Sequence, residues 1–149
     1  MTTKPSAKYA SRPIFYLLFC LGMIFAVGYA CTIMARSYTH EKLQVLTSRL
    51  KDYPLPPNAK VIKIESSMWE HTGNGDYCHY RVLQTIETSL SRADIEAYYT
   101  DAVIPGINEG GYTQPILLDF PEQQPIGDLL LFTAQVKDMS ERAFNFGCK

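Results

Sequence analysis

The stretch IFYLLFCLGMIFAVGYACTIMA, residues 14–35, decides the architecture of this chain. It contains no charged residue and no proline. A helix rises about 1.5 Å per residue, so a helix over this stretch reaches across a hydrocarbon core of roughly 30 Å. We therefore expect a transmembrane helix over residues 14–35, with the lipid bilayer as the first partner of the chain.

The charges beside this helix predict its orientation. Lys4, Lys8 and Arg12 precede it with no acidic residue among them, whereas Arg36 and Lys42 follow it close to an acid. A local excess of lysine and arginine favours the cytoplasmic side. We expect residues 1–13 to form a cytoplasmic tail and the C-terminal domain to be extracytoplasmic, in a bacterial inner or plasma membrane.

Three other interpretations of the stretch are weaker. Residues 28–30, Gly-Tyr-Ala, offer small residues at the spacing that signal peptidase reads, but the apolar run is longer than the roughly 7–15 residues of a signal peptide. Cys31 would be the acylated residue of a lipoprotein, but Gly28 stands where an aliphatic residue is usual. A charge-free run of this length is also unusual for a soluble core helix.

Small residues recur along one face of the expected span. Gly22, Ala26 and Ala30 are spaced four apart, a pattern that lets two membrane helices approach closely and self-associate. Glycine and alanine are also simply common in membrane helices, so both interpretations stay open.

Length and composition indicate that the rest of the chain is one folded domain without a nucleic-acid-binding charge pattern. The chain has 149 residues, and the part after the span, roughly a hundred residues, suffices for one domain. The formal net charge of −1 gives no basic footprint for nucleic acid. The apolar fraction, 46%, is too high for a disordered segment.

Two of the four cysteines, Cys78 and Cys148, remain outside the span. Each is in phase with the apolar face of its expected strand, and an exported compartment is oxidising, so we expect a disulfide between them. In a cytosolic domain the same pair would be two buried thiols. Cys20 and Cys31 are most simply small apolar side chains of the span.

Residues 36–57 are expected to form a helical stalk and a proline-rich linker. Leu43, Leu46, Leu50 and Tyr53 make one apolar stripe at helical spacing. The run Pro-Leu-Pro-Pro at 54–57 ends the helix. The stripe is compatible with a stalk that extends the membrane helix, which we prefer, or with a helix that folds back on the domain.

Residues 58–149 predict a two-layer α+β domain in which one helix covers an antiparallel sheet of four to five strands. Apolar alternation and turn residues place a hairpin first, with a polar connection over 66–76, and then a helix that starts at Ser91 and ends before Pro105-Gly106. The expected strands are 58–65, 77–88, 116–120, 128–137 and 143–148, with loops at 108–112 and 122–125 and a turn at 139–142.

Two short stretches carry a loose family resemblance. The run Leu-Pro-Pro-Asn-Ala-Lys-Val at 55–61, followed by a hairpin and a helix with Ala97-Tyr98-Tyr99, resembles small membrane-anchored or secreted bacterial α+β domains of unknown function. The resemblance covers residues 55–112 and implies no activity.

Few residues suggest chemistry. His71, Asp76 and His79 lie close in sequence and are ligand types for divalent metals, but their spacing matches no known metal motif. Cys78 and His79 are adjacent on a strand and would point to opposite faces, which argues against a nucleophile and its base. We therefore expect no catalytic residue, no metal and no cofactor.

Aromatic residues near glycine-rich segments are the better candidates for a binding surface. Trp69, His71 and Tyr112 are expected in or beside loops, where exposed aromatics typically anchor a partner or, alternatively, cap a small core. The sequence therefore favours a membrane-anchored interaction or accessory module that binds a membrane or envelope protein and has no catalytic activity. The alternative is a small metal-binding or enzymatic envelope domain that uses His71, Asp76 and His79.

Overall fold

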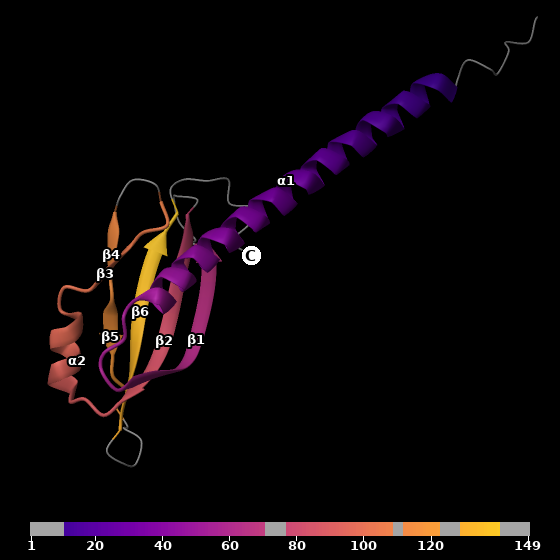
Figure 1. Ribbon diagram of the computed structural model, residues 1–149. Coiled ribbons are helices and arrows are strands. Elements are labelled where there is room, and N and C mark those ends of the chain that lie inside the picture. The colour runs from indigo at the N-terminus through magenta and orange to yellow at the C-terminus, as the bar shows by residue number, and fades with distance from the viewer. Residues whose placement is uncertain (1–10, 71–76, 109–111, 123–128, 141–149) are drawn as a thin grey trace, which may run out of the picture.

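The computed structural model describes residues 11–70, 77–108, 112–122 and 129–140. One helix, α1 (Ser11–Asp52), runs for 42 residues without interruption from the expected span into the domain (Figure 1). Its residues 14–34 are exposed throughout. By length and composition α1 can cross a membrane, as the sequence predicts.

The domain is built on a four-stranded antiparallel sheet in the order β1-β2-β6-β5. Its strands are β1 (Ala59–Glu70), β2 (Cys78–Thr88), β5 (Leu117–Asp119) and β6 (Leu130–Met139). β1 and β2 form the predicted hairpin pair, in which Ala59 lies opposite Thr88. Burial alternates strictly along β2, because successive strand residues point to opposite faces. The α+β class and the antiparallel sheet are thus as predicted.

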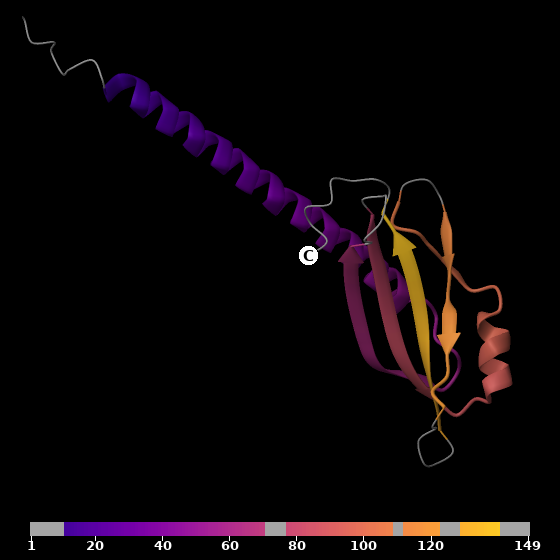
Figure 2. The same cartoon turned by 180° about the vertical axis from the view of Figure 1, so that it is seen from behind.

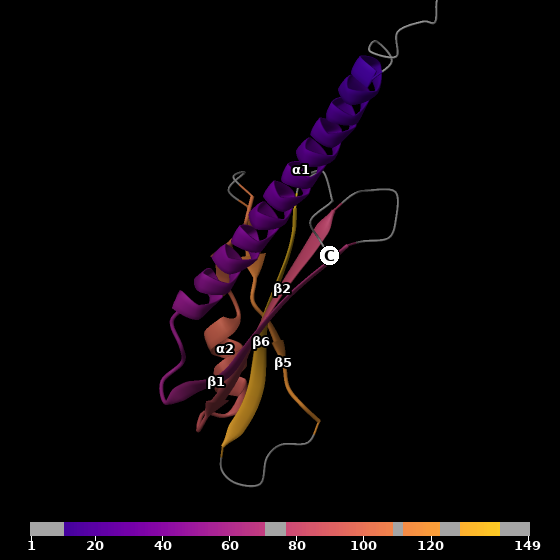
Figure 3. The same cartoon turned by 90° about the vertical axis from the view of Figure 1, so that its right-hand side faces the viewer.

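Both helices cover the same face of the sheet (Figure 3). Phe132 of β6 lies opposite Ile86 of β2, and both are fully buried beneath the helices. The ring of Tyr99, from α2 (Arg92–Tyr99), meets Phe132 edge-on with the centroids 6.0 Å apart. The opposite face, called the open face below, has no helix of the described chain in front of it (Figure 2).

The last turns of α1 belong to the domain core. Leu43, Leu46 and Leu50 have exposed fractions of 9%, 0% and 1%, and Tyr53 stacks on Tyr99. The helix continues directly from the apolar segment 14–35, as a stalk does, yet its apolar stripe packs on the sheet, as the fold-back alternative required. An amphipathic helix is stabilised mainly by burial of its apolar stripe, which is lost if the stripe is exposed to water. The sheet covers the stripe of α1 and so provides this burial.

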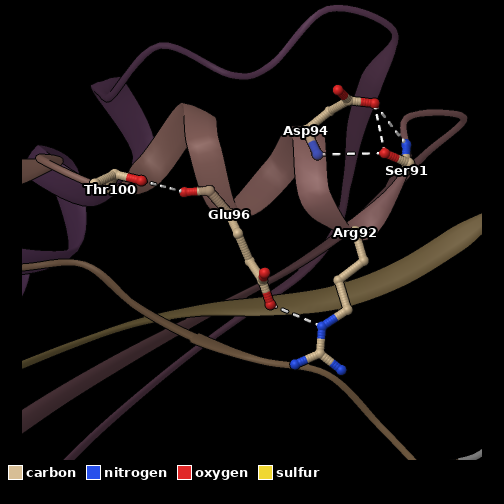
Figure 4. A network of polar contacts seen from close by, with 5 residues as sticks. All are labelled: Ser91, Arg92, Asp94, Glu96 and Thr100. Carbon is tan, nitrogen blue, oxygen red and sulfur yellow. Dashed lines mark hydrogen bonds and ion pairs between the residues drawn. The ribbon is translucent and has the colours of Figure 1, made fainter.

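Helix α2 begins as the sequence predicts and ends earlier. The Ser91 hydroxyl accepts from the Asp94 backbone N–H, and the Asp94 carboxylate accepts from the Ser91 backbone N–H and hydroxyl (Figure 4). The expected helix through residue 103 is wrong, because β3 (Val103–Pro105) pairs with β4 (Thr113–Pro115) in a second, two-stranded sheet. Pro105 disfavours helix in the preceding residue, so the chain extends there.

The long strands also exceed their predicted bounds. β1 continues to residue 70, so the expected polar connection over 66–70 is wrong, and β6 continues to Met139, where a turn was expected. Both strands are extended by their backbone hydrogen bonds to β2. The polar side chains in these extensions do not by themselves predict a strand. The short strand β5 lies at a sheet edge, a position in which the neighbouring Pro115 and Pro121 are tolerated. The expected strand 143–148 and the turn at 73–76 lie outside the described residues.

Candidate functional site

Three side chains form a row across the end of the sheet, on the open face. Trp69 of β1 lies opposite His79 of β2, which in turn lies opposite Met139 of β6. The rings of Trp69 and His79 are stacked, 5.4 Å between centroids and 12° between planes. Trp69 is 40% exposed and Met139 45% exposed. This set, called the tryptophan row below, is an ordered surface with an accessible apolar part.

The tryptophan row lies at the level where α1 enters the domain. On the covered face, the neighbouring ladder pair is Met68 and Tyr80. Burial, followed by smaller electrostatic contributions from Tyr38 and Asp138, raises the pKa of the Tyr80 phenol to about 12. Tyr38 belongs to α1, so this part of the helix lies near the ends of β1 and β2. The Tyr80 hydroxyl is buried and has no hydrogen-bond partner in the described part of the chain.

Polar groups line the middle of the open face. The Arg81 guanidinium donates from Nη2 to Oε1 of Gln135 at 2.8 Å. The buried Nε of Arg81 has no acceptor among the residues that the structure describes. Leu117 of β5, which lies opposite Gln135, is 47% exposed. Gln135 of β6 thus lies between the half-buried cation of β2 and the exposed aliphatic side chain of β5. The three positions together can accept a partner that offers both an acidic and an apolar group.

A buried carboxylate behind the tryptophan row was not foreseen from the sequence. Asp138, 7% exposed, accepts from the backbone N–H of Ile107 at 2.7 Å, from Nε2 of Gln114 at 3.0 Å and from the backbone N–H of Met139 at 2.7 Å. It thereby joins β6 to β4 and to the turn after β3. Its acceptors are occupied, so its role is structural. Strand periodicity places Asp138 on the covered face. The presence of an acidic residue there does not by itself predict which donors it accepts from.

Cations of α1 hold the same turn from the other side. Lys42 donates from Nζ to Oδ1 of Asn108 at 3.3 Å, and Arg49 donates from Nη1 to the carbonyls of Pro105, at 3.0 Å, and Gly106. The Asn108 amide donates in turn to the Met139 carbonyl at 2.8 Å. These contacts tie the helix to the strand end that carries the tryptophan row.

The residues expected to form one binding surface are not brought together. Trp69 lies in β1 rather than in a loop, which corrects that expectation, and His71 lies outside the described residues. Tyr112 is 71% exposed and precedes β4, a strand that lies on the opposite side of the domain from β1 (Figure 1). The partner of Trp69 is instead His79, which was not among the residues expected to form the binding surface.

Of the three residues of the metal hypothesis, the structure describes His79 alone. His71 and Asp76 lie outside the described residues, and within the described ranges no three histidine, cysteine or acidic side chains come close enough to hold a metal ion. Cys78 is disulfide-bonded and faces the core, whereas His79 faces the other way, so this pair does not form a nucleophile and base. Cys20 and Cys31 are free and exposed.

The predicted disulfide joins Cys78 to Cys148. Cys78 is disulfide-bonded and buried, but Cys148 lies outside the described residues, so the pairing of the two stays a prediction.

Comparison of the chain with protein-family models, with curated proteins and with solved structures gave no match. Function therefore has to be argued from the geometry of this chain.

Proposed function

We propose that this chain is a single-pass membrane protein whose extracytoplasmic domain is an interaction or accessory module without catalytic activity. The observation that carries the proposal is the continuity of α1. Its exposed apolar residues 14–34 suit lipid, and its last turns are buried in the domain. A domain fixed rigidly to its anchor suits a protein that presents a surface at a defined place.

The orientation rests on the flanking charges. Lys4, Lys8 and Arg12 precede the span, and the fewer cations after it favour a cytoplasmic N-terminus. A reporter that is active only in the exported compartment, fused after Lys149, is expected to be active. Activity only of a cytoplasm-specific reporter at that position would overturn the orientation.

The proposed partner is a membrane or envelope protein that binds the open face. Arg81 and Leu117 supply a cation and an exposed apolar group, and no described helix covers them. A second surface for assembly is the face of Gly22, Ala26 and Ala30 in the span. Small side chains at this spacing let a second copy of the helix approach closely.

Site-specific photo-crosslinking in native membranes tests the open face. Leu117 is replaced by a photoreactive phenylalanine in one variant and Val103 in the other, because both are apolar and 47% exposed but lie on different sheets. A discrete protein adduct from position 117 and not from position 103 is expected. Equal adducts from the two positions, or none from position 117, would refute the open face as the docking surface.

A further inference from the structure

The domain begins very close to the end of the apolar segment. Thr39 is only 6% exposed, and it lies four residues after Ala35, which corresponds to about 6 Å of helix rise. Lys42, one turn further on, already bonds to Asn108. The headgroup layer of a bilayer is about 5–8 Å deep on each side, the difference between the roughly 30 Å core and the 40–45 Å total. A helix that spans with residues 14–35 therefore leaves no room for a stalk between the bilayer and the domain.

The end of the sheet that carries the tryptophan row is the part that meets this layer. Lys42 of α1 donates to Asn108, and the Asn108 amide donates to the backbone carbonyl of Met139, which belongs to the tryptophan row. The paired ends of β1 and β2 lie at the end of the sheet on which α1 leaves the domain toward its N-terminus (Figures 1 and 3). The tryptophan row thus lies at the level of the first residues after the span.

The chemistry of the tryptophan row fits an interfacial position. Tryptophan is enriched where membrane meets water, because its apolar ring enters the upper chain region while its N–H stays with polar groups. Trp69 and Met139 are both partly exposed at the sheet end, and Lys137, one step back on the open face of β6, is an exposed cation suited to phosphate.

We propose that Trp69, His79 and Met139 rest in the headgroup region of the bilayer that α1 spans. The occupant of this surface is a phospholipid layer, and the domain is held against it in one orientation. The inference depends on α1 being the membrane anchor, as proposed above. Contact of the domain with lipid is a separate claim from anchoring, because a domain on a flexible stalk could be anchored by α1 without contacting lipid.

Trp69 is the sole tryptophan of the chain, so its fluorescence reports this contact directly. The full chain is reconstituted in phosphatidylcholine vesicles with and without lipid that carries a nitroxide on the headgroup. The matched control is the double variant Trp69→Phe, Ile62→Trp, since Ile62 is 50% exposed and lies on the same strand, about 23 Å away for seven residues.

Quenching of Trp69 at least about twofold stronger than that of the tryptophan at position 62 is expected, because nitroxide quenching requires near contact. Equal quenching of the two, in protein that floats with the vesicles, would refute the docking while the anchor stands. Protein that fails to float with the vesicles would refute the anchor itself, and the docking with it.

Discussion

Leu46 tests most directly whether the end of α1 is part of the domain core. Its side chain is fully buried beside the sheet, in the same stripe as Leu50. Burying a leucine contributes about 1.5–3 kcal/mol, and a cavity left by truncation adds to the loss. Leu46→Ala is therefore expected to lower the free energy of unfolding of the domain by about 2–5 kcal/mol.

Urea titration in mild detergent, followed by the fluorescence of Trp69, measures this loss. With a denaturant dependence of about 2 kcal/mol per molar, the midpoint should fall by roughly 1–2.5 M. Gln44→Ala is the control, because Gln44 is exposed on the same helix segment and its replacement should change the free energy by less than about 0.5 kcal/mol. If Leu46→Ala unfolds at the same midpoint as the control, the helix does not pack on the sheet as described.

Three further predictions concern the interior of the domain. Protein exported in vivo should have Cys78 and Cys148 blocked to alkylation until reductant is added, as measured by intact mass; two free thiols without reductant would exclude the bridge. Asp138→Ala should cost about 1–3 kcal/mol in a urea titration by leaving the buried Ile107 N–H without its acceptor; a loss below about 0.5 kcal/mol would mean that the hydrogen bond is unimportant. The raised pKa of Tyr80 favours its neutral form in the folded state, so its contribution to the free energy of unfolding is fully present below pH 10 and falls by up to about 1.4 kcal/mol per pH unit between pH 10 and about 12. Tyr80→Phe should weaken this loss of stability at alkaline pH, and an unchanged pH profile of stability would contradict the raised pKa.

Much of the fold could be predicted because its signals are local. The start of α2 follows from Ser91 and Asp94, which cap the helix within one turn. The hairpin of β1 and β2 follows from alternation and from turn residues between the strands. The end of α2 and the extension of β1 to residue 70 were missed, because pairing with other strands decides both.

The candidate site was predicted only as a set of residue types. Trp69 was recognised as an exposed aromatic, but its partner His79 was not, because the two are ten positions apart and meet only through the β1–β2 register. Tyr112 was grouped with Trp69 on composition, whereas Trp69 lies in β1 of the four-stranded sheet and Tyr112 precedes β4 of the separate two-stranded sheet. Shared composition does not specify shared location.

The sequence by itself determined the membrane-length helix, since a charge-free run needs nothing beyond its own length and composition to suit lipid. It also determined that Leu43, Leu46 and Leu50 share one helix face, because helical spacing is a local property. Only the tertiary structure decided what covers that face. Burial against the sheet depends on contacts between residues far apart in the chain, and those contacts bring the domain close to the end of the apolar segment of α1.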